Sequence, residues 1–205
     1  MVAPREPKQD RSRVTRQRLL EATIESLAEQ GWGPTTVGHV AERAGVSRGA
    51  TQHHFPTRED LITAALDYMF ETRMGDAVAE EHDLPTGSDR TEAVVARLVE
   101  YYTGPMFKAA LQVWTAASSD PELRARVLPL EDKFGRAAHR TAVRHLGVDD
   151  ADPRTHRLVQ ATLDLARGLG LADLLSDDSR RRGEIVRAWA AVLESSLPAA
   201  ADGPR

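Results

Sequence analysis

The sequence contains no cysteine among its 205 residues. This absence excludes a disulfide framework and any metal site built on thiolates, and it fits a protein of the reducing cytoplasm. Long apolar runs are also absent, because no stretch approaches the ~20 apolar residues that a membrane-spanning helix requires. The opening residues, MVAPREPKQDRSR, lack the apolar segment of a secretory signal. We therefore expect a cytoplasmic protein that is not associated with a membrane.

Catalytic and metal-binding motifs are missing as well. We find no HExxH pair, no glycine-rich phosphate loop and no convincing Ser-His-Asp spacing. The adjacent pair His53–His54 would point about 100° apart on a helix, which is unfavourable for sharing one ion. We expect one of these two side chains near a phosphate and the other partly packed. The following histidines are scattered, and we expect them to be hydrogen-bonded or solvated: His82, His139, His145 and His156. The sequence thus predicts no enzyme, no cofactor and no metal.

Charge is distributed unevenly along the chain. The composition is 41% hydrophobic and 28% charged, which allows a buried core in a soluble protein, and the net charge is −4. Residues 1–58 carry nine Lys and Arg against six Asp and Glu, a net charge of +3, so residues 59–205 carry −7. Only the N-terminal part would face a polyanion favourably. The alternative is an ordinary solvated surface.

Helical periodicity runs through almost the whole chain. Leu20, Ile24 and Leu27 recur at the spacing of one helix face, and Gly31 is a typical helix end. The later segments repeat this pattern, with caps such as Asp120-Pro121 and Asp152-Pro153, and we see no alternation typical of strands. The sequence therefore predicts an all-α fold. Its polar ends read as a flexible basic arm (1–12) and a disordered tail (198–205).

Two short helices around Gly45 form a helix-turn-helix pattern. Thr36 is a natural N-cap, and one apolar stripe follows over 37–44. Gly45 ends the first helix because glycine adopts the left-handed conformation most easily. Ser47 caps the second helix, which reaches about His53. The order of helix, glycine-containing turn and helix is typical of DNA-binding domains, although many helical hairpins share it.

The second short helix carries the side chains that a helix in the major groove requires. Gly49 and Ala50 keep its first turn slim, Arg48 can contact guanine, and Gln52 can contact adenine or a phosphate. Free N–H groups at the starts of neighbouring helices, beside Thr36 and Arg58, can hold phosphates. The predicted DNA-contacting residues are Thr36, Ser47, Arg48, Gly49, Ala50, Gln52, His53, His54 and Arg58.

The remaining helices could surround a small molecule. Large apolar side chains at helical spacing are core by default, so ordinary packing is the alternative to ligand contact. Asp164 and Arg167 lie in a largely apolar helix, where we expect them to be buried, paired with each other or lining a polar pocket. The predicted ligand-contacting residues are Met69, Phe107, Trp114, Phe134, Asp164 and Arg167.

The last two helices are apolar on more than one side, so they must bury two faces. One face can meet the chain's own core and the other a second copy, which favours a two-fold dimer. The predicted interface residues are Leu158, Thr162, Leu165, Leu169, Ile185, Trp189 and Leu193.

Residues 18–61, RLLEATIESLAEQGWGPTTVGHVAERAGVSRGATQHHFPTREDL, strongly resemble the N-terminal domain of TetR-family transcriptional regulators. The matching features are Gly31, TTV at 35–37, AGVS at 44–47, HHF at 53–55 and TREDL at 57–61. The resemblance implies a recognition helix at 47–54, phosphate contacts from Thr36 and Arg58, and a C-terminal ligand-binding and dimerisation domain. It also implies a four-helix bundle formed by the last two helices of each copy.

Two positions depart from the family pattern. An aromatic residue is common where Gln52 stands, and leucine is common where Thr51 stands. Gln52 could therefore read a base, and Thr51 could bury a hydroxyl that bonds back to Ser47. These departures affect the operator sequence rather than the DNA-binding role.

The sequence therefore predicts a helix-turn-helix DNA-binding domain (13–57) and a helical ligand-binding and dimerisation domain (58–197). We expect a repressor that binds a palindromic double-stranded DNA operator as a homodimer and is released by a small-molecule effector. A helical enzyme is one alternative, which the missing motifs disfavour. The other is a helical interaction module that has lost DNA binding.

Overall fold

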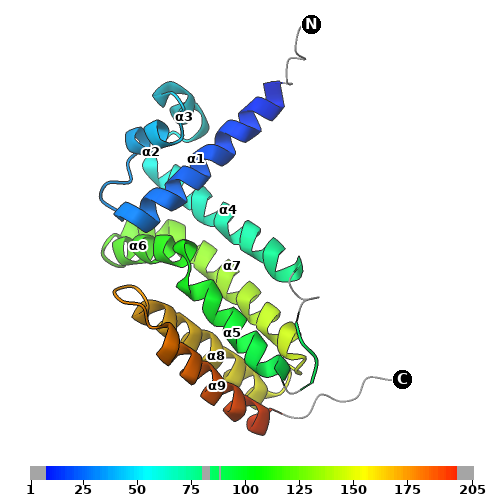
Figure 1. Ribbon diagram of the computed structural model, residues 1–205. Coiled ribbons are helices and arrows are strands. Elements are labelled where there is room, and N and C mark those ends of the chain that lie inside the picture. Colours follow the sequence, from blue (N-terminus) through cyan, green and yellow to red (C-terminus); the bar gives the residue numbers. More distant parts are fainter. Residues whose placement is uncertain (1–7, 80–83, 88, 198–205) are drawn as a thin grey trace, which may run out of the picture. The chain divides into compact units, whose positions relative to one another are not determined.

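The computed structural model describes residues 8–79, 84–87 and 89–197, with side chains omitted at 8–9 and 74–79. The expected tail and residues 1–7 of the expected arm lie outside these ranges. Within them the chain is all-α, as predicted (Figure 1). The helices are α1 (Lys8–Gln30), α2 (Val37–Arg43), α3 (Arg48–His54), α4 (Arg58–Ala79), α5 (Asp89–Thr103), α6 (Pro105–Ser119), α7 (Pro121–Leu146), α8 (Pro153–Ala172) and α9 (Ser179–Ser196). None of these helices is both long enough and apolar enough to cross a membrane.

Local sequence signals determine most helix boundaries. The hydroxyl of Thr36 accepts a hydrogen bond from the amide N–H of His39 at 3.2 Å. The carboxylate of Asp152 likewise accepts a hydrogen bond from the amide N–H of Thr155 at 2.8 Å. Thr57 and Asp60 form a capping box, in which each side chain accepts a hydrogen bond from the other residue's amide N–H. Side-chain caps of this kind satisfy amide groups that have no partner within the helix, so they specify where a helix begins.

Two helices extend further than the apolar pattern indicates. α1 begins at Lys8, so residues 8–12 of the expected flexible arm are helical. α4 continues to Ala79, past the point after Arg73 where its apolar pattern ends. Polar residues such as Lys, Gln, Glu and Arg are good helix formers, and a helix can therefore continue where its apolar stripe has stopped.

The chain divides into two compact units. Unit 1 comprises residues 1–72 and 108–130, and unit 2 comprises 73–107 and 131–205. Unit 1 contains α1, α2 and α3 together with the first part of α4. Its fully buried side chains include Leu19, Leu27, Val40, Leu61 and Ile62. The predicted segment 13–57 thus lies entirely in unit 1, which extends beyond it to include parts of three further helices.

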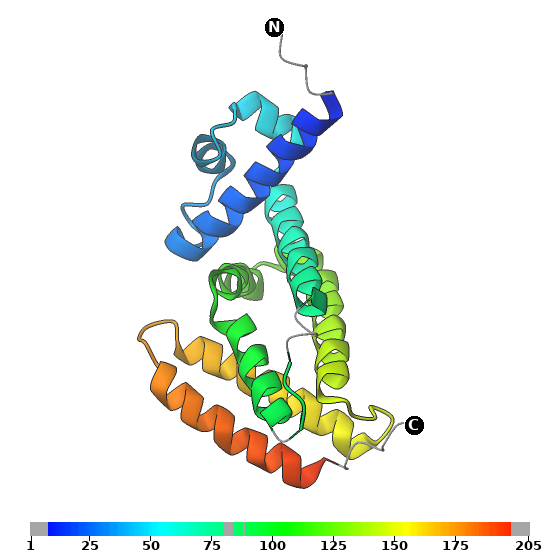
Figure 2. The same ribbon diagram turned by 45° about the vertical axis from the view of Figure 1, so that its right-hand side comes forward.

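Unit 2 is built around α5, which packs against both α8 and α9. α8 and α9 lie side by side in both views (Figures 1 and 2). The core of unit 2 includes Val94, Leu98, Val159, Leu163 and Leu193. Gly170 of α8 lies so close to α5 that an added Cβ would be 2.0 Å from the carbonyl oxygen of Tyr102.

Candidate nucleic-acid interface

The turn between α2 and α3 is specified by backbone hydrogen bonds and one glycine. Gly45 has φ +62°, a left-handed conformation that favours glycine. The amide of Val46 donates to the carbonyl of Ala41 at 2.9 Å, which satisfies a carbonyl at the end of α2. Ser47 then caps α3 by accepting the amide N–H of Ala50 at 3.2 Å. The predicted helix-turn-helix is therefore present.

α3 is held in place from its inner side. Thr51 is fully buried, and its hydroxyl donates to the carbonyl of Ser47 at 3.1 Å. The prediction that Thr51 bonds back to Ser47 is thus confirmed, and the bond satisfies a polar group that would otherwise be costly to bury. Phe55, which follows the helix, is 4% exposed. These two residues fix which face of α3 points outward.

The outward face of α3 carries the side chains that the sequence analysis identified. Ser47, Arg48, Gly49, Gln52 and His53 are exposed. Among the residues that the structure describes, Arg48 and Gln52 have no hydrogen-bond or ion-pair partner. A guanidinium and an amide are therefore available, one turn apart, on a helix whose first turn is kept slim by Gly49 and Ala50.

The two histidines at the end of α3 lie in different environments. His53 is exposed, whereas His54 is half-buried and its ring lies 6.3 Å from that of Phe55. Burial lowers the pKa of His54, and the nearby charges of His53 and Arg16 lower it further. The guanidinium of Arg16, on α1, lies 5.4 Å from the Phe55 ring. The Arg16 guanidinium therefore lies beside the end of α3.

Ion pairs and hydrogen bonds connect α1 to the helix-turn-helix. Arg43 at the end of α2 pairs with Glu25 at 3.0 Å and with Glu29 at 2.9 Å. Arg18 donates to the carbonyl of Ala44 at 2.5 Å. α1 therefore supports the α2–α3 turn by direct contacts with Arg43 and Ala44 at the end of α2.

The Arg58 side chain, which was expected to bind phosphate, is instead bonded to backbone carbonyls of its own chain. Its Nε donates to the carbonyl of Thr35 at 2.7 Å, and an Nη donates to the carbonyl of Trp32. The guanidinium also lies 4.1 Å from the centre of the Trp32 ring. Burial lowers the pKa of Arg58. The side chain thus fixes the turn before α2, and a phosphate contact would compete with these bonds.

We expect Arg58→Ala to lower the free energy of unfolding by about 1.5–3 kcal/mol, since a charged donor to two backbone carbonyls is lost. Arg58→Lys should restore little, because an ammonium cannot reproduce the planar fork or its stacking on Trp32. Urea unfolding followed by circular dichroism measures both changes, with Arg124→Ala, an exposed arginine on α7, as the control. An Arg58→Ala variant of unchanged stability but weakened DNA binding would instead support the phosphate contact.

The predicted ligand-contacting residues fall into both units. Met69 and Trp114 belong to unit 1, and the other four belong to unit 2. Phe107 is buried, with its ring 5.2 Å from that of Tyr102, and Phe134 is half-buried. Phe107 therefore behaves as a core residue of unit 2.

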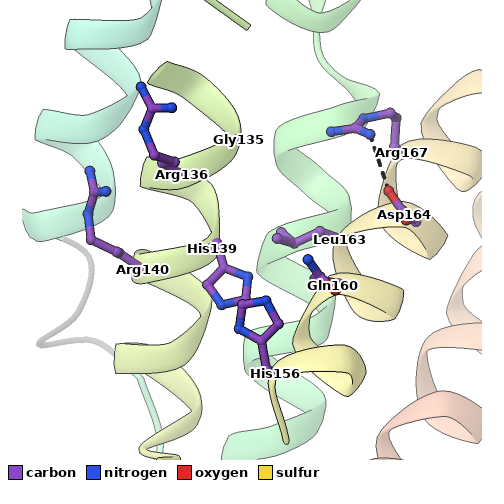
Figure 3. A pocket seen from close by; sticks show the side chains of 9 residues that line it. All are labelled: Gly135, Arg136, His139, Arg140, His156, Gln160, Leu163, Asp164 and Arg167. Carbon is purple, nitrogen blue, oxygen red and sulfur yellow. Dashed lines mark hydrogen bonds and ion pairs between the residues drawn. The ribbon is translucent and has the colours of Figure 1, made fainter. Parts of the chain in front are cut away.

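Asp164 and Arg167 line an open cavity of about 560 Å³ in unit 2 (Figure 3). The two pair with each other at 3.2 Å, as predicted. The expectation that they are buried is wrong for Asp164, whose side chain is 73% exposed, whereas Arg167 is half-buried with 37% of its side chain exposed. Asp164 lies on a side of α8 that faces solvent, where a charged residue is accommodated in water. The cavity is lined by Gly135, Arg136, His139, Arg140, His156, Gln160, Leu163, Asp164 and Arg167.

The predicted dimer residues are partly engaged within their own unit. Thr162, Leu169 and Leu193 are buried in unit 2, and the Trp189 indole donates to the Thr162 hydroxyl at 2.9 Å. The other residues, which are half-buried, are Leu158, Leu165, Ile185 and Trp189. These stripes therefore contribute largely to the core that α8 and α9 form with α5 of the same chain.

A cluster of two histidines and one aspartate was missed by the sequence analysis. His139 Nε2 lies 2.7 Å and His156 Nδ1 lies 3.0 Å from the same oxygen of Asp150. Hydrogen bonds from His139 and then from His156 lower the pKa of Asp150. The three residues come from α7, the connection to α8, and the first turn of α8. Only the antiparallel return of the chain after Gly147 brings them together, and the sequence signals that turn without showing which side chains will meet.

Comparison with known proteins agrees with this geometry. Residues 19–65 match the family model of bacterial regulatory proteins, tetR family. The HTH-type transcriptional regulator CymR of Pseudomonas putida is 30% identical over 124 residues, which cover 60% of this chain and 61% of that protein. The HTH-type transcriptional regulator BetI of Escherichia coli is 31% identical over 122 residues, which cover 57% and 62%. The match therefore spans about three fifths of the length of each curated relative.

A solved structure extends the similarity over most of the fold. A transcriptional regulator from Saccharomonospora viridis, in complex with choline, is 25% identical with a TM-score of 0.63. The alignment covers 89% of this chain and 96% of that one. The helix-turn-helix geometry, the family model that residues 19–65 match and these relatives together show that the N-terminal part of the chain is similar to that of TetR-family bacterial regulatory proteins.

Proposed function

We propose that this protein is a transcriptional regulator that binds a palindromic DNA operator as a homodimer, represses transcription and is released by a small molecule. The observation that carries the proposal is the outward face of α3, on which Arg48 and Gln52 are exposed and have no partner among the described residues. A helix of this kind reads base edges in the major groove. Its place of action would be the cytoplasm, where bacterial DNA lies.

Charge supports DNA as the partner of the N-terminal part. Residues 1–58 have a net charge of +3 in a chain of −4. A polyanion would therefore attract the segment that contains α3 and would be repelled by the rest of the chain. Thr36 and Ser47, which cap α2 and α3, lie where amide groups at helix starts can contact phosphates. We assign residues 13–57 to DNA binding and residues 58–197 to effector binding and dimerisation.

Dimerisation would use the outer faces of α8 and α9. Their exposed residues include Ala161, Leu171, Ala188 and the 45%-exposed Val192. Small and apolar side chains of this kind allow helices of two copies to approach closely, and a two-fold axis then buries the same patch twice. Half-buried Leu165 and Trp189 would form the edge of this contact, whereas Thr162, Leu169 and Leu193 would support it from inside.

The effector site would be the cavity lined by Asp164 and Arg167. Its lining combines charged groups, imidazoles and the amide of Gln160 with a single leucine. Tyr, Trp and Phe are absent from this lining, whereas quaternary ammonium groups are typically held by aromatic rings. We therefore infer a polar effector that forms hydrogen bonds, rather than the choline found in the relative.

α4 would carry the effector signal. It begins in unit 1 at Arg58 and continues into unit 2 from Arg73. Leu61 and Ala65 are buried in unit 1, and the Tyr68 hydroxyl bonds to Glu21 of α1 at 3.0 Å. The first turns of α4 must therefore move together with α1. An effector that favours one position of α4 by a few kcal/mol would suffice to empty an operator.

The proposal is tested by electrophoretic mobility shifts of the full chain on the DNA upstream of its own gene. We expect specific retardation of this duplex, together with weaker binding to random duplex that declines steeply with added salt, because bound cations displace counterions from the phosphates. If neither duplex is retarded at low salt, the proposal fails, and a helical interaction module without DNA binding becomes the better interpretation.

A further inference from the structure

We propose that His139, Asp150 and His156 bind a divalent first-row transition-metal ion. Among the residues that the structure describes, these three form the one group whose ligand atoms, one from each residue, lie within 4.8 Å of one another. Neither the family match nor the fold requires this site. The proposal also stands independently of DNA binding, because it depends only on the end of α7 and the start of α8.

The donor set indicates the class of metal. Two imidazole nitrogens and one carboxylate oxygen suit Zn²⁺, Co²⁺ or Ni²⁺, whereas Mg²⁺ and Ca²⁺ prefer oxygen ligands. Three protein ligands leave a further position for water or for an incoming group, which is the pattern of open zinc sites. The carboxylate also supplies one negative charge, which partly neutralises the ion.

The distances are close to those of a coordinated ion. Metal bonds of about 2.0–2.2 Å place tetrahedral ligand atoms about 3.3–3.5 Å apart. The Asp150 oxygen already lies 2.7 Å from His139 Nε2 and 3.0 Å from His156 Nδ1. A slight opening of the cluster would therefore admit the ion. The ion would take the place of the two imidazole N–H protons, which now donate hydrogen bonds to the Asp150 carboxylate.

The surroundings permit both access and close approach of the ligands. The rings of His139 and His156 face each other between α7 and α8, with their centroids 4.5 Å apart (Figure 3). Arg136 and Arg140 on α7 point away from these rings, and both also line the same cavity (Figure 3). The Asp150 side chain is 40% exposed, and both histidines line the cavity. An ion could thus enter from solvent, and its open position would face the cavity.

The test is uptake of Zn²⁺ and Co²⁺ alone by untagged, chelator-treated full-length protein without DNA. Calorimetry should show one Zn²⁺ per chain, and Co²⁺ should give a visible absorption band. Asp150→Asn and His156→Gln should each weaken binding by at least about tenfold, since even loss of an outer-shell partner costs roughly 10–100-fold. Asp149→Asn, which changes the neighbouring exposed carboxylate in the same way, should bind like the wild type.

Thermal melting gives a second readout that reveals any folding defect of the variants. Zn²⁺ should raise the melting temperature of wild type and Asp149→Asn, because an ion that binds only the folded state stabilises it. The same addition should raise the melting temperature of Asp150→Asn and His156→Gln clearly less, because their affinity for the ion is lower. Failure of the wild type to take up one equivalent, or equal uptake by the two ligand variants, would overturn the proposal and leave a cluster that only hydrogen-bonds α7 to α8.

Discussion

Gly170→Ala should destabilise the protein by at least about 2 kcal/mol, because overpacking of this kind typically costs 1–3 kcal/mol or more. The added Cβ would lie 2.0 Å from the carbonyl oxygen and 2.7 Å from the carbonyl carbon of Tyr102. These are backbone atoms inside α5, so no side-chain rotation can relieve the contact. α5 and α8 would have to move apart along the core of unit 2.

Gly168→Ala is the matched control, because it lies on the same helix and nothing is within 4 Å of its added Cβ. Alanine at an unhindered helical position should stabilise by about 0.5–1 kcal/mol, since it restricts the unfolded chain. Scanning calorimetry should therefore show opposite shifts, with a loss of roughly 4–8 °C for Gly170→Ala. Equal melting temperatures of the two variants would show that α5 and α8 are not in such close contact.

Arg48→Ala combined with Gln52→Ala should lower operator affinity by at least about 30-fold, since each bidentate base contact contributes roughly 1–3 kcal/mol of discrimination. Both side chains are exposed, and Thr51 and Phe55 hold α3 from the other side, so the substitutions should leave the helix in place. Fluorescence anisotropy with the upstream duplex measures the loss.

Two further variants separate base reading from simple charge attraction. Arg48→Lys keeps the charge but loses the planar fork, so it should retain binding to random duplex and lose preference for the operator. Arg124→Ala removes one exposed positive charge from α7 and should bind like the wild type. The assignment of α3 would be wrong if the double variant bound the operator as tightly as the wild-type chain.

Features that depend on neighbouring residues could be predicted from the sequence. The caps at Thr36, Ser47 and Asp152 form hydrogen bonds to amides three residues ahead. Gly31 and Gly45 both adopt positive φ at the predicted helix ends. Each of these signals reflects chemistry within about one turn of helix, which single-sequence reasoning can follow.

Features that depend on tertiary contacts could not be predicted in this way. The sequence shows that Arg58 begins a helix, but the Thr35 and Trp32 carbonyls that engage it become visible only after folding. The sequence gives no sign that His139 and His156 meet, because they belong to different helices. Asp164 was expected to be buried because its helix is rich in leucine, although that face of α8 is exposed.

Hydroxyl-radical footprinting of the upstream DNA tests the central claim most directly. Two copies of α3 related by a dyad should protect two half-sites whose centres lie about 34–36 Å apart, one turn of the double helix. The Arg48→Ala, Gln52→Ala variant should lose both protections together. A single protected segment without a symmetric partner, or protection that survives in this variant, would contradict the claim that paired α3 helices read the operator.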